Sequence, residues 1–417
     1  MKKQRKRIIT YAVAAFLATV LAGTVILFGY TMWNKASGKD MAREALAVLD
    51  EETEDATPKV GVADEKSEQN QPGPDLAETE KSEETEMSEE MAEIEELTGQ
   101  AVLAFGGDIC FHDPFANMQS LAQRGGAIES CISEELLAEM RNADICMVNN
   151  EFPYSDRGTP IPEKTFAFRS KPENVALLGS MGVDIVSLAN NHAYDHGETA
   201  FLDTLEILEN AGVKYVGAGR NLAEASAAQV FEVNGVKIGI LAATQIERLD
   251  TPDTKGATEN SAGVLRCFSQ SELEQFLSVV EETKKECDVL IVYIHWGTEN
   301  TDELDWAQPY QADLISKAGA DLIVGAHPHC LQGIDSVNGV LVVYSLGNYW
   351  FNSKALDTAL LKVTVGVDGV KSVQLLPARQ ENCATSLLRD GDKQRVLTYL
   401  QSLSANVVMD EEGYITW

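Results

Sequence analysis

Short apolar runs that end abruptly in polar residues recur along the chain from residue 100 onward. Runs of this length, bounded by Gly, Asn and Pro, are typical of buried strands. They lie at 101–105, 144–148, 183–188, 237–241, 289–294, 320–326 and 340–344. Amphipathic patterns typical of helices separate them, at 131–142, 172–181, 199–211, 269–286 and 309–318. This alternation predicts an α/β fold with helices outside the sheet, in which ligands bind at the carboxyl ends of the strands.

The last part of the chain predicts further strands and one helix. Alternating apolar residues at 359–367 and 370–376 flank Asp368-Gly369, a dipeptide that favours a hairpin turn. A helical pattern follows at 392–402, and a short strand closes the chain. We therefore predict a main domain at 100–355, completed by C-terminal strands and a helix at 356–417.

Every histidine of the chain stands at or just after the end of a predicted strand. They are His112, His192, His196, His295, His327 and His329. Beside them stand Asp108, Glu151, Asn191 and Glu299. This set offers nitrogen and oxygen donors without thiolate, which favours Zn, Mn or Fe in a hydrolytic site over a structural zinc site. The sequence therefore predicts a site for divalent metal ions, one or two in number.

The run at 320–326 ends in His327-Pro328-His329. In an extended segment, residues two apart point to the same side, so both imidazoles are expected to face one site. They would then bind either one ion or two ions roughly 3.5–4 Å apart. The alternative is a pair of loop histidines that only form hydrogen bonds.

The N-terminus carries the pattern of a membrane anchor. Five Lys and Arg side chains lie within residues 1–7, and the uncharged stretch at 8–34 is long enough to cross a bilayer as a helix. The basic tail is expected to stay in the cytoplasm, which places the rest of the chain outside. We predict an uncleaved, single-pass signal anchor at the cell membrane, with an extracytoplasmic globular domain. The alternative is a signal peptide that is cleaved near Lys35-Ala36-Ser37-Gly38.

Acidic residues are concentrated between this anchor and the globular part. The whole chain has a net charge of −32, and the stretch from Asp50 to Glu96 holds 19 Asp and Glu against 3 Lys. Such a charge argues against nucleic acid as a partner, because phosphate binding needs clustered Lys and Arg. The segment 35–99 also has almost no aromatic residues, so it is predicted to be a disordered acidic linker.

Six short motifs, taken in order, resemble those of one protein family. They are Gly-Asp at 107–108, Asn-Asn-Glu at 149–151, Ala-Asn-Asn-His at 189–192 with Asp195 and Gly197, His-Trp-Gly-Thr-Glu at 295–299, Gly-Ala-His-Pro-His at 325–329, and Tyr-Ser-Leu-Gly-Asn at 344–348. The chain resembles the CapA family of capsule and poly-γ-glutamate biosynthesis proteins, whose fold is similar to that of calcineurin-like metallophosphoesterases. The resemblance implies an α/β/β/α sandwich.

The resemblance also implies roles for single residues. Asp108 would be the metal ligand of the first strand, Glu151 the bridging carboxylate and Asn191 an amide ligand. His295 and His327 would complete one metal site and His329 the other. His192 would be the general acid or a donor that stabilises the transition state. The first phosphatase motif is Asp-x-His, but this chain has Cys110 at the third position, and His112 is the nearest histidine that could replace it.

Further residues near the strand ends are candidates for substrate binding. We assign this role to Glu299, Arg169, Asn348 and His112, and Arg169 suits an anionic substrate because its guanidinium binds bidentately. Trp296 is either part of the groove or a packing residue. His196 and Asp195 are either a pair that orients ligands or a helix-start cap.

The predicted function follows from the anchor, the metal site and the resemblance. We expect a protein of capsule or poly-γ-glutamate production, export or anchoring that works through metal-assisted hydrolysis or transfer. Its expected partners are the membrane, a membrane synthase, and an anionic polymer such as poly-γ-glutamate or a phosphoester substrate. The alternatives are a non-catalytic accessory that holds the polymer beside the synthase, and an extracytoplasmic metallophosphodiesterase unrelated to capsule.

Overall fold

The computed structural model describes residues 99–248 and 254–417. The predicted basic tail at 1–7, the predicted membrane span at 8–34 and the acidic linker up to residue 98 lie outside these ranges. Within the two described ranges, no helix has the length and apolar character needed to span a lipid bilayer.

The first of two large sheets has eight strands in the order β16-β15-β14-β1-β2-β3-β4, with β13 paired to β1 beside this path. They are β1 (Gln100–Ile109), β2 (Ile145–Asn150), β3 (Ile185–Ser187), β4 (Lys214–Val216), β13 (Asn348–Trp350), β14 (Leu356–Gly366), β15 (Gly369–Glu381) and β16 (Ala384–Leu387). Strands β1 to β4 run parallel. Strands β14 to β16 extend the sheet in antiparallel fashion, and the β14–β15 hairpin confirms the turn predicted at Asp368-Gly369.

The second sheet has six strands in the order β11-β12-β10-β9-β7-β6. They are β6 (Gln229–Val233), β7 (Val236–Thr244), β9 (Val289–His295), β10 (Leu322–Ala326), β11 (Ile334–Val337) and β12 (Val340–Val343). The four central strands run parallel, and β6 and β11 close the two edges as antiparallel partners. The predicted strands thus divide between two sheets.

A helix forms in each range where the sequence predicts one. The larger ones are α3 (Ala116–Gln123), α4 (Glu134–Asn142), α5 (Ala176–Met181), α6 (Gly197–Ala211), α8 (Gln270–Lys284), α9 (Ala307–Lys317) and α10 (Asp390–Leu403). Helix α8 begins with a capping box in which Ser269 and Glu272 satisfy each other's backbone N–H groups. The short elements are η1 (Ile128–Ser130), η2 (Pro172–Val175), α7 (Leu222–Ala225), β5 (Ala218–Gly219), β8 (Gly263–Val264), β17 (Val408–Met409) and β18 (Ile415–Thr416). Helices α3 and α7 form where no helix was predicted.

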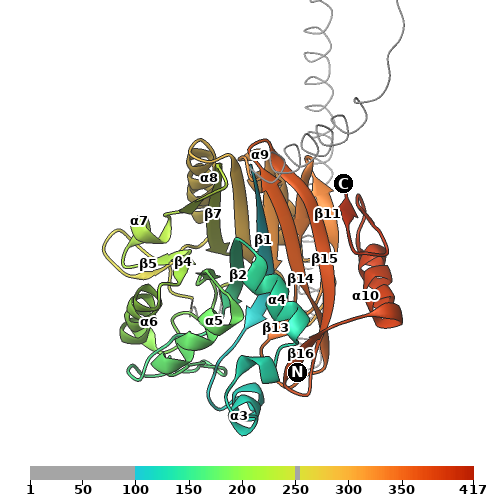
Figure 1. Cartoon of the computed structure of the whole chain (residues 1–417). Coiled ribbons are helices and arrows are strands. Elements are labelled where there is room, and N and C mark those ends of the chain that lie inside the picture. The colour runs from blue at the N-terminus through green and yellow to red at the C-terminus, as the bar shows by residue number, and fades with distance from the viewer. Residues whose placement is uncertain (1–98, 249–253) are drawn as a thin grey trace, which may run out of the picture. The chain divides into compact units, whose positions relative to one another are not determined.

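The two sheets pack face to face between two layers of helices (Figure 1). Apolar side chains of both sheets, such as Phe105 and Ile291, form a shared inner core. Helices α4, α5 and α6 cover the outer face of the first sheet, and α8 and α9 cover the outer face of the second. This is the α/β/β/α sandwich that the family resemblance implies.

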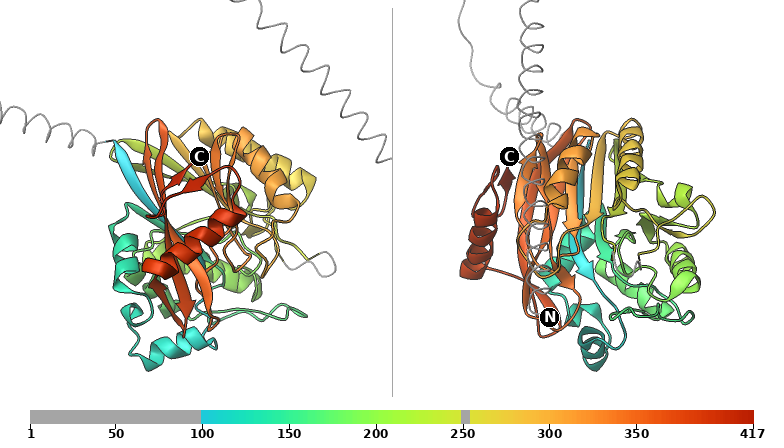
Figure 2. Two further views of the ribbon diagram at one scale, coloured as in Figure 1. Left: turned by 90° about the vertical axis from the view of Figure 1, so that its right-hand side faces the viewer. Right: turned by 180° about the vertical axis from the view of Figure 1, so that it is seen from behind.

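Helix α10 closes one side of this sandwich (Figure 2). Its buried side chains Val396, Leu397 and Leu400 belong to the core between the sheets, and it contacts β15 and β11, which come from different sheets. The helix therefore covers an edge at which apolar residues of both sheets would otherwise meet water.

Candidate metal centre

The parallel strands of both sheets end at the same place, and their last side chains meet there. Strand β1 carries Asp108 near its end, and Glu151 directly follows β2. From the second sheet, His295 is the last residue of β9, and His327 directly follows β10. The centre therefore lies where two sheets face each other, which is why residues so distant in sequence come together.

Two groups of these side chains have the spacing needed to hold a metal ion. One consists of Glu151, His295 and His327, and the other of Asp108, Glu151 and His329. In each group, one ligand atom of every residue lies within 4.8 Å of the others. Glu151 belongs to both, as the family resemblance implies for a bridging carboxylate. The Oδ1 atom of Asn191 lies 2.9 Å from His295 Nε2, so this amide also reaches the first group.

Unpaired buried atoms in these groups fit a bound cation. Glu151 Oε1 and His327 Nδ1 are buried and have no hydrogen-bond partner among the described residues. Imidazole nitrogens surround that oxygen just beyond hydrogen-bond distance, at 3.8 Å from His192 and from His329 and at 4.0 Å from His295. Unsatisfied buried polar atoms are costly, and a nitrogen and oxygen donor set of this kind suits divalent Zn, Mn or Fe.

The protonation preferences of the first group also favour metal binding. Burial, together with the other histidines, holds the pKa of His295 and of His327 well below the usual value. Both imidazoles are therefore neutral near pH 7 and keep a lone pair for a metal. Burial and then the charges of Asp108 and Glu299 raise the pKa of Glu151 well above the usual value. A cation would offset this crowding of negative charge.

His329 differs from His295 and His327 because its ring contacts the carboxylate of Asp108. Its Nδ1 atom lies 3.2 Å from Asp108 Oδ2 and 2.8 Å from Asn348 Oδ1. Burial alone would lower the pKa of His329, but the hydrogen bond to Asp108 and the negative charge of that carboxylate outweigh burial and raise it. Asn348 thus supports a metal-site histidine.

The backbone of the His-Pro-His segment is not extended, so the geometric reason given for its convergence is wrong. Strand β10 ends at Ala326, and His327 and His329 have φ angles of 100° and 59°, both in the left-handed region. Such angles are costly for residues with a side chain, and strained residues of this kind are enriched at functional sites. The turn sends the two imidazoles into different metal groups, with their ring centroids 6.0 Å apart.

An amide network that the sequence analysis did not assign holds the carboxylates in place. Asn149 Nδ2 lies 2.7 Å from Asp108 Oδ1 and 3.2 Å from Glu151 Oε2. Asn190 Nδ2 in turn donates to Asn149 Oδ1 at 3.0 Å. The available signal was the position of Asn149, two residues before Glu151, which places both side chains on one face of the strand.

The orientation of His192 is fixed by Asp195, which also forms an ion pair with Lys164. Its Nδ1 lies 2.7 Å from Asp195 Oδ2, and the other oxygen of Asp195 lies 2.7 Å from the ammonium of Lys164. The ring also stacks on Phe168, with centroids 4.3 Å apart. Asp195 therefore positions His192. Of the two roles expected for His196 and Asp195, His196 takes the helix-start position as the N-cap residue of α6, although its side chain forms no capping hydrogen bond. Lys164 gave no sequence signal, because a lone loop lysine is common.

A pocket of about 340 Å³ opens beside the centre. His192, Glu299, His329 and Asn348 line it, together with Phe115, Ala116, Phe166, Phe168, Asn300, Phe351, Asn352, Ser353 and Lys354. Two of the predicted substrate residues, Glu299 and Asn348, thus lie in its wall. Arg169 does not, and its guanidinium donates instead to the backbone oxygen of Arg157 at 3.1 Å. Trp296 is fully buried and donates to the backbone oxygen of Tyr344, which favours its packing role.

Comparison with known proteins assigns the chain to a family. Residues 102–353, which contain both metal groups, match the family described as bacterial capsule synthesis protein PGA_cap. The chain belongs to this family. The matched range covers both large sheets as far as β13, whereas β14 to β18 and α10 lie beyond it.

Named relatives of this PGA_cap chain come from several bacteria. The PGA biosynthesis protein CapA of Bacillus subtilis is 31% identical over 61% of this chain and 67% of its own length. The capsule biosynthesis protein CapA of Bacillus anthracis is 29% identical over 63% of this chain and 64% of its own. A probable polyglutamine synthesis accessory protein of Mycobacterium tuberculosis is 27% identical over 59% and 69%. The chain thus matches about two thirds of the length of each relative.

The position at which this PGA_cap chain departs from the phosphatase pattern lies outside the metal groups. Cys110 is fully buried in the core beneath the helices, and burial raises the pKa of its thiol well above the usual value. His112, the proposed replacement, lies with its Nδ1 3.0 Å from the backbone oxygen of Arg169. It belongs to neither described group, and it does not line the pocket.

Proposed function

We propose that this PGA_cap protein acts in capsule or poly-γ-glutamate biosynthesis as a metal-dependent hydrolase. The observation that carries the proposal is the buried Glu151 carboxylate shared by two groups of metal-ligating side chains. The names of the relatives support the polymer-related role. The predicted anchor at 8–34 supports a location at the outer face of the cell membrane, beside a membrane synthase.

The division of labour follows from the positions of the side chains. Glu151, His295 and His327, with Asn191 beside them, would hold one ion, and Asp108, Glu151 and His329 would hold the other. A pair of divalent ions supplies Lewis acidity, which activates water and neutralises charge in phosphoryl transfer. Asn149 keeps the two carboxylates at a fixed separation.

His192 is the residue placed to move a proton. Asp195 accepts the hydrogen of Nδ1, which leaves Nε2 directed at the pocket and at Glu151, 3.8 Å away. When Nε2 carries a proton, it can donate that proton to the oxygen of the leaving group. Lys164 and Asp195 keep the ring in this orientation, in the manner of a catalytic triad's carboxylate.

A second candidate function is a non-catalytic accessory of a polymer synthase. Two observations favour it: the phosphatase motif's first histidine is replaced by Cys110, whose side chain faces the core, and one relative is named an accessory protein. In this case the same ions would bridge the acidic protein and an anionic polymer.

Metal analysis separates these candidates from a site that holds no metal. We would measure the metal content of the full-length protein, of a His327→Ala, His329→Ala variant and of a His112→Ala control, which removes an imidazole outside both groups. About two transition-metal ions per chain are expected in the wild type and the control, with loss in the double variant. Equal metal content in all three proteins would contradict the centre.

Hydrolysis and polymer binding are then measured on the metal-loaded protein. Hydrolysis of phosphoesters by the loaded wild type supports the hydrolase. Metal-dependent binding of poly-γ-glutamate without hydrolysis of phosphoesters or of the polymer supports the accessory.

A further inference from the structure

Aromatic side chains form one wall of the pocket at the metal centre. Phe168 stands at its middle, with ring centroids 5.1 Å from Phe115, 5.8 Å from Phe351 and 6.4 Å from Phe166. The innermost rings adjoin the site, since Phe168 stacks on His192. The outermost ring, Phe166, is 64% exposed. An apolar surface therefore leads from the proposed proton donor out to solvent.

Three segments far apart in the sequence build this wall, so it is not a by-product of one apolar run. Phe115 precedes α3, Phe166 and Phe168 lie in the loop between β2 and η2, and Phe351 follows β13. Buried packing would account for Phe168 and Phe351, which are at most 5% exposed. Phe166 is instead exposed, and it extends the row of rings from Phe168 to the solvent side of the pocket.

The rest of the pocket lining is mostly polar and carries little positive charge. Lys354 is the single lysine among the lining residues, which include no arginine. Its ammonium lies 3.3 Å from Asn300 Oδ1, at the exposed rim. Glu299, also in the lining, adds a negative charge. The pocket thus combines an apolar wall with one exposed cation and the metal groups.

We propose that the pocket binds a phosphate ester of an apolar alcohol. The phosphate lies toward His192 and His329, and the apolar group runs along the phenylalanine wall and leaves past Phe166. This inference rests on the proposed function and names its substrate class. A volume of about 340 Å³ accommodates the phosphate and the first part of the apolar group, since small-molecule pockets start at about 300 Å³.

The chemistry of the wall makes poly-γ-glutamate a poor direct ligand for this pocket. Each γ-glutamyl unit carries a carboxylate and an amide, which lose hydrogen bonds to water and find none on phenylalanine rings. Lys354 could pair with one carboxylate only, and Glu299 would repel the others. The polymer therefore serves as the competing ligand in the test.

Two phosphonates test the inference without being hydrolysed, because their C–P bond is stable. We would measure the binding of hexylphosphonate and of dihydroxybutylphosphonate to the metal-loaded, full-length protein in nanodiscs of zwitterionic lipid, with empty nanodiscs as the blank. Hexylphosphonate is expected to bind at least tenfold more tightly. Equal dissociation constants would overturn the inference.

Two substitutions test the phenylalanine wall and the Lys354 ammonium separately. Phe166→Ser should reduce the preference for hexylphosphonate over dihydroxybutylphosphonate to about threefold or less. Val367→Ser is the control, at a valine of the β14–β15 turn that is 58% exposed, and it should leave this preference unchanged. Lys354→Gln should weaken both phosphonates by a similar factor and preserve the preference. If the Phe166→Ser variant still binds hexylphosphonate tenfold more tightly, the phenylalanine wall does not bind the apolar group as proposed. A γ-glutamyl oligomer that binds more tightly than hexylphosphonate would also overturn the inference.

Failure of this inference can be distinguished from failure of the proposed hydrolase. Hydrolysis of hexyl phosphate and glycerol phosphate at equal kcat/KM would retain the hydrolase and reject the apolar substrate. A Phe166-dependent preference for hexylphosphonate without any hydrolysis would retain the apolar ligand and reject the hydrolase.

Discussion

At the residue scale, two glycines let the strand ends of this PGA_cap protein approach closely enough to form the centre. A Cβ atom at Gly107, next to Asp108, would stand 1.9 Å from the backbone oxygen of Gly347. A Cβ at Gly325, two residues before His327, would stand 2.0 Å from the backbone oxygen of Tyr344. Both obstacles are backbone atoms, so rotation of a side chain cannot relieve them. The positions of Asp108 and His327 thus each depend on a nearby glycine.

Gly325→Ala is expected to destabilise the fold by about 3 kcal/mol, the upper range for overpacking a core. Its added methyl must push β10 away from the segment after β12, which also displaces His327. Gly179→Ala is the matched control, because a Cβ there meets nothing within 4 Å, and α5 gains a better helix former. Urea unfolding of both variants measures the effect. A Gly325→Ala variant as stable as the control would contradict this packing argument.

His192→Ala is expected to lower kcat by about 10²- to 10⁴-fold, the usual contribution of a general acid. The metal content should not change, because His192 belongs to neither metal group. Steady-state kinetics with phosphoesters and elemental analysis of the same preparation measure the two effects. An unchanged kcat would remove the proposed proton-transfer role, and lost metal would make His192 part of the metal site.

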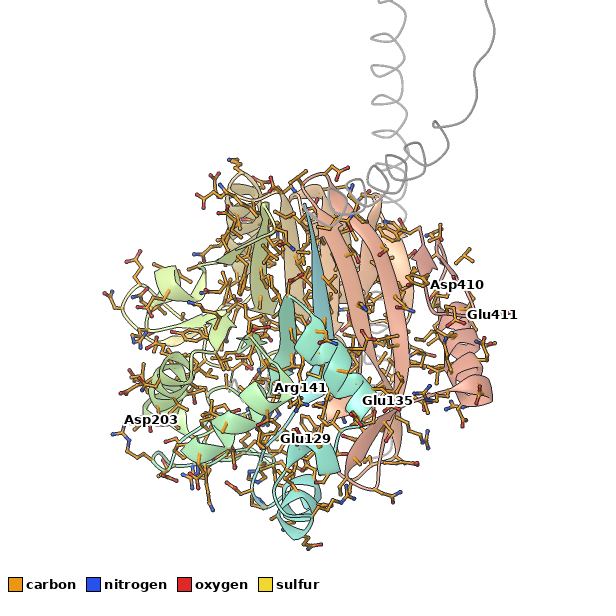
Figure 3. All side chains as sticks on the ribbon, in the orientation of Figure 1. Glu129, Glu135, Arg141, Asp203, Asp410 and Glu411 are labelled. Atoms are coloured by element: carbon orange, nitrogen blue, oxygen red, sulfur yellow. The ribbon has the colours of Figure 1, made fainter. Side chains whose placement is uncertain are left out.

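At the scale of elements, ion pairs attach helix α10 to the first sheet. Asp357 of β14 accepts hydrogen bonds from Arg379 of β15 at 2.8 Å and from Arg395 of α10 at 2.7 Å. Arg389, at the start of α10, donates to Glu135 of α4 at 2.8 Å. Figure 3 labels Glu135 on α4. The helix is therefore bound by charge as well as by its apolar side chains in the core.

Asp357→Asn is expected to cost about 1 kcal/mol near pH 7, since Arg395 is half exposed and solvent screens the pair. Burial alone would raise the pKa of Asp357, but the hydrogen bonds from Arg395 and Arg379 outweigh it and lower the pKa. The stabilisation is therefore complete above the unfolded-state pKa of about 4 and is lost as the pH falls through the folded-state value.

Urea unfolding of wild type and variant between pH 7 and pH 3 tests this dependence. The difference in the free energy of unfolding should shrink toward pH 3. Asp156→Asn, at an exposed carboxylate, controls for the loss of a charge. A difference that stays constant or grows on acidification would contradict the assignment.

At the scale of the whole molecule, the centre joins the two sheets. Asp108 and Glu151 come from the first sheet, and His295 and His327 come from the second. An ion held by Glu151, His295 and His327 would therefore link them across the end of their shared core. Such a ligand stabilises the folded state by mass action, by about 2.7 kcal/mol at a concentration 100-fold above its Kd.

Removal of metal with a chelator is therefore expected to lower the Tm of the wild type by several degrees, while Glu151→Gln, which lacks the shared ligand, should respond little. Thermal unfolding followed by circular dichroism, before and after chelation and after readdition of zinc or manganese, measures both responses. An identical Tm with and without chelator in metal-loaded wild type would argue against an ion that joins the sheets.

Much of this molecule follows from local sequence patterns. The positions of most strands and helices could be predicted from the spacing of apolar residues, which recurs every two residues in a strand and every 3.6 in a helix. This spacing, like a turn signal such as Asp368-Gly369, reflects interactions between near neighbours in the chain. The gathering of Asp108, Glu151 and His327 at strand ends also followed, since parallel strands deliver such residues to a common edge. The four-layer arrangement and the residue roles came from the family resemblance instead.

Only the tertiary structure decided what depends on the approach of distant segments. It placed Asp195 against His192, and it turned the chain at His327 and His329 through left-handed backbone angles where an extended segment was expected. It also directed Cys110 into the core and assembled the phenylalanine wall from three segments. These outcomes depend on packing between residues that are remote in sequence, and no local periodicity encodes which of them will touch.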